Sequence, residues 1–143
     1  MTEGKTVAII GAGPIGLAAA AHAMEQGLKP VVLEAGPQVG HAVRQWKHVQ
    51  LFSPWEYSID KASERLLAVT GWNSPDPHVY PTGADLIEQY LEPLVTKTPL
   101  KEIVRTSSKV TAISRVGYDK LKTKGREAAA FELRYQNGGV QKR

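Results

Sequence analysis

The chain has 143 residues, of which 42% are hydrophobic, a composition typical of one ordinary globular domain. It contains no cysteine, which excludes disulfides, thiolate metal sites and a redox-active cysteine pair, and which fits a reducing, cytoplasmic location. The net charge of +4 comes from the last third of the chain: residues 1–100 carry 7 basic and 10 acidic side chains, whereas residues 101–143 carry 11 basic and 4 acidic ones. These basic residues lack the aromatic pattern of a nucleic-acid platform, so we predict no nucleic-acid partner.

The first predicted elements form a strand, a glycine turn and a helix. Residues 7–10 predict a strand buried on both faces, and residues 14–26 predict a helix that Gly27 ends. Gly11-Ala12-Gly13-Pro14-Ile15-Gly16 lies between them, in the order that a dinucleotide fingerprint requires. The uncharged run 7–24 is interrupted by glycine, proline and histidine, so we predict neither a membrane span nor a secretion signal there.

Each residue of the turn has a separate predicted task. Gly11 allows a tight turn, Gly13 leaves room for a pyrophosphate, and Gly16 lets the helix pack closely on the sheet. Pro14 suits the first helical turn because its missing N–H would have no partner there. The N–H groups of Ile15 and Gly16, with the positive end of the helix dipole, are predicted to bind the anion.

A second predicted strand, residues 30–33, ends in Glu34, which lies 21 residues after Gly13. A carboxylate at this position accepts hydrogen bonds from the ribose hydroxyls and repels a 2′-phosphate. We therefore assign Glu34 and the neighbouring Ala35 to the adenosine ribose.

Residues 35–57 distinguish between two dinucleotides. An NAD-binding dehydrogenase domain would continue from Glu34 into another helix and strand. This segment instead contains glycine, proline and four large aromatic residues without a helical or strand period. Such a segment favours a loop that wraps an extended ligand, and so favours FAD.

The stretch V-A-I-I-G-A-G-P-I-G-L-A-A-A, followed by V-V-L-E-A-G-P-Q-V-G, resembles the amino-terminal FAD-binding segment of pyridine-nucleotide-dependent FAD oxidoreductases, especially the flavin-containing monooxygenases. In that family a Gly-Gly pair before a tryptophan follows the glutamate. Gly40 and Trp46 match this motif, whereas His41 stands at the second glycine position and the spacing to Trp46 is longer. The resemblance implies that Gly40 belongs to the cofactor site, and that Arg44, Trp46 and the turn 51–54 lie near the flavin ring.

Residues 80–94 are similar to the family's helix after the active-site segment. Thr82 is predicted to cap this helix together with Asp85. The helix carries one apolar stripe, assigned to the core, of Leu86, Ile87, Tyr90, Leu91 and Leu94. Residues 102–115 look like the family's strand pair, in which the backbone near a valine, here Val110, faces the adenine.

No catalytic residue can be named. Residues 60–71 predict a short helix in which Asp60 is a cap and Arg65 faces solvent. The histidines at 22, 41, 48 and 78 lack metal-ligand spacing, so no metal site is predicted. The alternating residues 109–116 and 131–135, followed by Asn137-Gly138-Gly139, predict strands and a turn.

The expected fold is an α/β, Rossmann-like FAD/NAD(P)-binding domain with three layers: a small parallel sheet, helices on one face and a β-hairpin or meander on the other. We expect residues 1–143 to form a single, partial FAD-binding domain, the front part of a longer flavoprotein or a truncated reading frame. The resemblance implies that the NADPH motif lies in the full-length parent. An NAD-binding dehydrogenase domain and a non-catalytic nucleotide-binding module stay open as alternatives.

Overall fold

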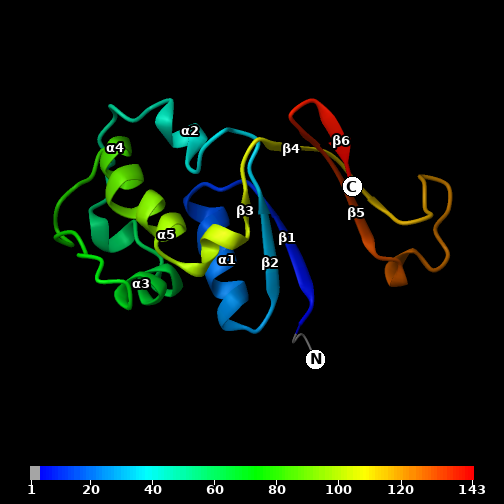
Figure 1. The fold of residues 1–143 in the computed structure, drawn as a ribbon, viewed down its shortest axis with the longest axis horizontal. Coiled ribbons are helices and arrows are strands. Elements are labelled where there is room, and N and C mark those ends of the chain that lie inside the picture. The colour runs from blue at the N-terminus through cyan, green and yellow to red at the C-terminus, as the bar shows by residue number, and fades with distance from the viewer. Residues whose placement is uncertain (1–3) are drawn as a thin grey trace.

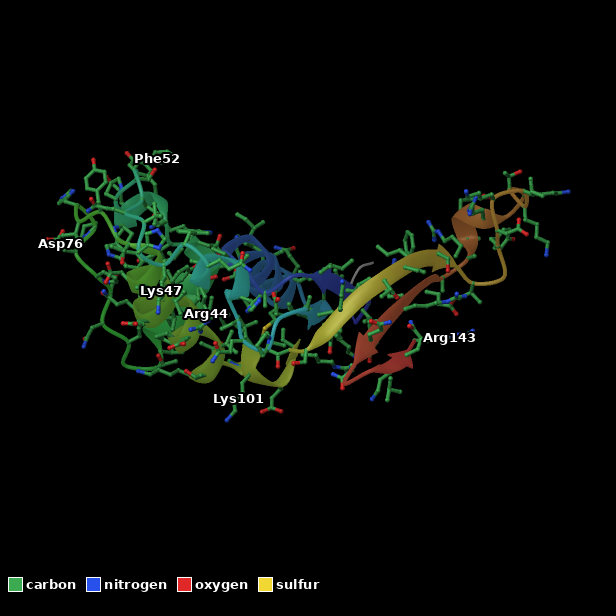
Figure 2. All side chains as sticks on the ribbon, turned by 90° about the horizontal axis from the view of Figure 1, so that it is seen from above. Arg44, Lys47, Phe52, Asp76, Lys101 and Arg143 are labelled. Carbon is green, nitrogen blue, oxygen red and sulfur yellow. The ribbon has the colours of Figure 1, made fainter. Side chains whose placement is uncertain are left out.

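The computed structural model describes residues 4–143. Its three layers follow one another from left to right in Figure 1: a helical body, a small parallel sheet and an antiparallel sheet. In the view from above, the antiparallel sheet projects away from the helical body (Figure 2). This arrangement confirms the predicted α/β class, with a small parallel sheet, helices beside it and a separate antiparallel β-meander.

The parallel sheet has the strand order β1-β2-β3. Its strands are β1 (Thr6–Ile10), β2 (Lys29–Leu33) and β3 (Val104–Arg105). β1 pairs with β2 along its whole length, from Thr6 opposite Lys29 to Ile10 opposite Leu33. The prediction that β1 is buried on both faces is wrong, because Thr6, Ala8 and Ile10, which point to one face of the strand, are exposed. β1 is also an edge strand, since no other strand among residues 4–143 pairs with its far side.

Helix α1 (Pro14–Glu25) packs against the sheet through small side chains. Its buried residues are Leu17, Ala20, Ala21 and Ala23. The helix ends as predicted at Gly27, whose φ is +70°, and the N–H of Leu28 donates to the carbonyl of Ala23 at 2.9 Å.

The helical body consists of short elements between β2 and β3 (Figure 1). They are α2 (His41–Arg44), η1 (Trp55–Tyr57), α3 (Lys61–Ala68), α4 (Gly83–Leu86), η2 (Ile87–Leu91), α5 (Glu92–Thr96) and η3 (Pro99–Glu102). The five residues of the predicted apolar stripe are all buried, each 4% exposed or less. Trp55 and Leu67 complete the core around them.

A proline interrupts the long helical segment formed by α4, η2 and α5. The segment begins with the predicted capping box, in which Thr82 Oγ1 accepts the N–H of Asp85 and the Asp85 carboxylate accepts the N–H of Thr82. Pro93 has no N–H to donate to the carbonyl of Gln89, and η2 is a π-helical turn at this point. The indole N–H of Trp72 donates to that carbonyl at 2.8 Å. The sequence pattern did not predict this turn.

The antiparallel sheet has the order β4-β5-β6. Its strands are β4 (Ser108–Arg115), β5 (Phe131–Asn137) and β6 (Val140–Lys142), and η4 (Arg126–Ala128) lies between β4 and β5. The register shifts between Val110 and Ala112, which marks a β-bulge. At the start of β4, the N–H of Ser108 donates to the carbonyl of Glu34 at 2.7 Å. This hydrogen bond attaches the antiparallel sheet to the end of β2.

Candidate dinucleotide-binding site

The glycine turn lies where the carboxyl end of β1 meets the amino end of α1. Gly11 has a φ of +99°, which favours glycine, and its N–H donates to the carbonyl of Leu33 at 2.8 Å. A Cβ on Gly16 would lie 1.9 Å from the carbonyl oxygen of Gly11, so only glycine allows this contact between helix and turn. A Cβ on Gly13 would meet no atom within 4 Å, which leaves open space in front of the turn.

The first turn of α1 presents backbone donors without a capping side chain. Gly13 is the N-cap residue in an extended conformation, and Pro14 follows it in the first turn. The N–H groups of Ile15 and Gly16 belong to the turn whose donors lack partners within the helix, and the helix dipole adds positive charge there. This end of α1 can therefore bind an anionic group such as a pyrophosphate.

Glu34 lies beside the glycine turn at the carboxyl end of β2 and is only 9% exposed. Its Oε2 accepts the N–H of Ala12 at 2.8 Å, and its Oε1 accepts the N–H of Gly36 at 2.7 Å. Each carboxylate oxygen has further acceptor capacity, so Glu34 can hold these two loops and still accept hydrogen bonds from hydroxyl groups. The position of Glu34 after β2 was predicted, whereas its hydrogen bond from the N–H of Ala12 was not.

The segment after Glu34 folds back onto the glycine turn. Ala35 is exposed, and Gly40, with a φ of +65°, donates its N–H to the carbonyl of Ala12 at 2.8 Å. The structure thus brings the glycine turn, Glu34 and Gly40 together at the carboxyl end of the parallel sheet, the position at which such sheets bind ligands.

Arg44 and Trp46 contact the helical body. The guanidinium of Arg44 donates through Nη2 to Glu92 Oε1 at 2.6 Å and through Nε to the carbonyl of Val39 at 3.2 Å. The ring of Trp46 lies against the backbone of Gly83, where a Cβ would be 2.9 Å from Cε3. The contact of Arg44 and Trp46 with a flavin ring stays a prediction.

Val110 is half-buried on β4, close in sequence to the corner that joins the two sheets. At this corner the N–H of Ser107 donates to the carbonyl of Gly36 at 2.8 Å. The side-chain amide of Asn137 donates to the carbonyl of Ser107 at 3.2 Å and to Ser108 Oγ at 3.1 Å. The start of β4 is therefore bound to the Glu34 loop, and the adenine contact of Val110 stays a prediction.

One pairing between loops was missed by sequence reasoning. The N–H of Leu51 donates to the carbonyl of Pro81 at 2.8 Å, and the N–H of Trp55 donates to the carbonyl of Val79 at 3.0 Å. Phe52 on this loop is almost fully exposed and points outward at the end of the helical body (Figure 2). Because the pairing uses backbone groups of irregular segments, no side-chain period could have indicated it.

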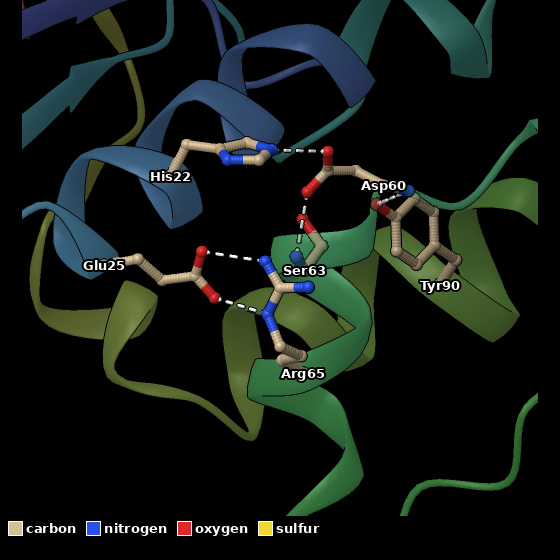
Figure 3. Close-up of polar contacts among 6 residues, drawn as sticks. All are labelled: His22, Glu25, Asp60, Ser63, Arg65 and Tyr90. Atoms are coloured by element: carbon tan, nitrogen blue, oxygen red, sulfur yellow. Dashed lines mark hydrogen bonds and ion pairs between the residues drawn. The ribbon is translucent and has the colours of Figure 1, made fainter.

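A polar cluster links α1 to α3 (Figure 3). His22 Nε2 lies 2.8 Å from Asp60 Oδ1, and Arg65 donates to both carboxylate oxygens of Glu25 at 2.6 and 2.8 Å. Asp60 caps α3, as predicted, by accepting the N–H of Ser63. Burial raises the pKa of Asp60, but the hydrogen bonds from Ser63 and His22 outweigh this effect and hold it below its ordinary value. The partners of His22 and Arg65 were not predicted.

The described part of the chain bears on two other kinds of site. Among residues 4–143, no group of three or more His, Asp or Glu side chains is arranged to hold a metal ion. The helices of the same residues lack the length and apolar content that crossing a membrane requires.

A glycine turn after the first parallel strand, an uncapped helix terminus and a buried acid after the second strand together define a dinucleotide-binding α/β domain. Residues 8–132 match the pyridine nucleotide-disulphide oxidoreductase family. Because this match covers most of the chain, the protein belongs to that family.

Three solved structures share the fold. The bacillithiol disulfide reductase of Bacillus cereus aligns over 98% of this chain and 36% of its own, with a TM-score of 0.65 and 23% identity. The polycyclic ketone monooxygenase of Thermothelomyces thermophila aligns over 98% and 21%, with a TM-score of 0.63 and 21% identity. OTEMO in complex with FAD and NADP aligns over 96% and 24%, with a TM-score of 0.63 and 18% identity.

The chain thus spans about a third of the reductase and less than a quarter of the length of these two monooxygenase-type structures. No curated protein matches the chain by sequence.

Proposed function

We propose that this chain is the FAD-binding part of an FAD-dependent oxidoreductase, most similar to the NADPH-linked flavin monooxygenases. The observation that carries the proposal is the buried carboxylate of Glu34 beside the uncapped amino terminus of α1. A pyrophosphate fits the helix terminus, and ribose hydroxyls fit the carboxylate, which would repel the 2′-phosphate of NADP. The family match and the FAD in the OTEMO structure support this proposal.

Different residues of the chain would bind different parts of FAD. The pyrophosphate would be held by Gly11, Gly13, Pro14, Ile15 and Gly16. Glu34 and Ala35 would bind the adenosine ribose, and the backbone near Val110 would face the adenine. Gly40, Arg44 and Trp46 would border the flavin half. When bound, FAD supplies the redox chemistry, while these residues bind and orient it.

We further propose that residues 1–143 form one domain of a longer parent that also binds NADPH. The chain has a single G-x-G-x-x-G motif. The monooxygenase-like chemistry of that parent is proposed from the sequence resemblance described above and from the similarity in fold to the polycyclic ketone monooxygenase. A cytoplasmic location and the absence of a nucleic-acid partner stay predictions.

Two rival functions make different demands, one on the chain after Glu34 and the other on the ligand that is bound. An NAD-binding dehydrogenase domain needs another helix and parallel strand directly after β2. The next strand of the parallel sheet is β3, which begins only at Val104. A non-catalytic nucleotide-binding module would keep affinity for ADP without using a flavin.

Calorimetric titration of the purified protein with FAD, NAD, NADP and ADP, together with its visible spectrum, tests the proposal. We expect FAD and ADP to bind, and NADP to bind more weakly. Glu34→Ala should weaken FAD and ADP binding by about 1–3 kcal/mol through lost charged hydrogen bonds. Glu56→Gln, at an exposed position in η1, is the matched control.

The outcomes separate the candidate functions. A protein that contains no flavin and takes up no added FAD would contradict the FAD proposal. NAD binding more tightly than FAD would favour the dehydrogenase domain, and ADP binding without FAD binding would favour the non-catalytic module. Unchanged affinity in Glu34→Ala would count against the role assigned to Glu34.

A further inference from the structure

A continuous set of hydrogen bonds runs from Glu34 to helix α5. Ala12 donates its N–H to the Glu34 carboxylate and accepts the N–H of Gly40 at 2.8 Å. The carbonyl of Gly40 accepts the N–H of Arg44 at 3.0 Å. The guanidinium of Arg44 then donates to Glu92 on α5 at 2.6 Å.

The side chain of Arg44 joins the segment of residues 39–44 to helix α5. Helix α2 has only one turn and buries only Val43, so its own contacts hold it weakly. The planar fork of Arg44 binds the carbonyl of Val39 and the carboxylate of Glu92 at the same time. The side chain of Arg44 is 25% exposed and that of Glu92 is 42% exposed, so solvent screens this ion pair in part.

We propose that Arg44 is a positioning residue whose ion pair with Glu92 holds residues 39 and 40 against the glycine turn, so that the dinucleotide site is formed before the ligand arrives. A preformed site binds more tightly because binding does not have to order the segment. The expected effect on FAD affinity rests on the proposed function. The expected ordering of residues 39 and 40 in the ligand-free protein does not depend on it.

Hydrogen exchange of the Gly40 amide in the ligand-free protein measures directly how firmly residue 40 is held, because that N–H donates to the carbonyl of Ala12. In Arg44→Gln and in Glu92→Gln we expect exchange about three- to fivefold faster, the size of effect expected from a lost, partly exposed ion pair. The double variant should exchange no faster than Arg44→Gln alone, since both changes remove one interaction. Arg44→Lys, which keeps the charge but not the fork, should restore protection in part.

The matched control is Arg65→Gln, which breaks the ion pair with Glu25 between α3 and α1 and should leave exchange at Gly40 unchanged. FAD titration of the same variants is the second readout, with the FAD dissociation constant expected to rise about three- to fivefold in both single variants.

Unchanged exchange at Gly40 in Arg44→Gln and Glu92→Gln would overturn the inference. Weaker FAD binding in Arg44→Gln alone, with Glu92→Gln like the wild type, would also overturn it and assign Arg44 to direct contact with the cofactor. Faster exchange in a protein that binds no FAD would refute the proposed function and support the positioning role. If Arg44→Gln does not fold, Glu92→Gln and Arg44→Lys decide the outcome.

Discussion

Gly13 and Gly16 have different surroundings although both belong to one fingerprint. Gly13 has a φ of −85° and open space at the position of a Cβ. At Gly16 the same position lies 1.9 Å from the backbone oxygen of Gly11, an atom that cannot move aside cheaply. One glycine therefore serves the proposed ligand, and the other serves the packing of the protein itself.

This contrast predicts that two similar substitutions differ in their effect on stability. Gly16→Ala should lower the free energy of unfolding by about 1–3 kcal/mol, because the methyl group forces the helix away from the turn. Gly13→Ala should change it by less than about 1 kcal/mol, because alanine fits the folded conformation and reduces the freedom of the unfolded chain but is a poorer N-cap residue than glycine. Chemical denaturation measures both.

The same pair of variants separates stability from binding. Gly13→Ala should weaken FAD and ADP binding in a folded protein, because its methyl group lies where the pyrophosphate is proposed to approach the backbone. A stable Gly13→Ala variant with wild-type affinity for both ligands would refute the proposed position of the pyrophosphate.

Helices α1 and α3 are joined by a polar cluster of four side chains, His22, Asp60, Arg65 and Glu25 (Figure 3). Because the pKa of Asp60 is lower in the folded protein than its ordinary value of 3.8, its ionised form stabilises the fold above that pH. This contribution is lost as the pH falls below 3.8 and through the pKa of the folded state.

Asp60→Asn tests this contribution. Asparagine can still cap α3, so the substitution mainly removes the charge that faces His22. We expect a loss of less than about 1 kcal/mol at pH 6, and a smaller drop in melting temperature between pH 5 and pH 3 than in the wild type. Asp76→Asn, at an exposed loop position, is the control for removing a carboxylate elsewhere. An identical acid profile in Asp60→Asn and the wild type would refute the role of Asp60.

The elements that could be predicted from the sequence depend on residues close together in the chain. The glycine turn, the capping box of Thr82 and Asp85, and the apolar stripe of the helix after it are all of this kind. The contacts that could not be predicted join distant residues: Arg44 and Glu92 are 48 positions apart. A single sequence contains no spacing signal for such a pair, because the path of the loops between them decides which side chains meet.

The two sheets meet at one corner, formed by the loop after Glu34 and the start of β4. Asn137 reaches this corner from the end of β5 and bonds Ser107 and Ser108. The antiparallel sheet otherwise projects away from the rest of the protein (Figure 2). Its orientation therefore depends on a small number of polar contacts.

Asn137→Ala should loosen this corner without unfolding the parallel sheet. We expect the free energy of local opening at the amides of Ser107 and Ser108 to fall by about 1 kcal/mol, with the β1 and β2 amides unchanged. Hydrogen exchange measures the two groups of amides in one experiment. Gln141→Ala, which removes a polar side chain from β6, is the control. Equal loss of protection in both sheets would show that they open as one unit.

The exposed edge of β1 has a consequence for handling the protein in solution. Among residues 4–143, β1 pairs only with β2, and an edge strand with apolar residues on both faces can add a strand from another molecule. The rate of such encounters rises with protein concentration and is highest while chains are still folding. The yield of monomer from refolding should therefore fall as the chain is concentrated, and a charged substitution at exposed Ala8, on the same strand, should raise that yield.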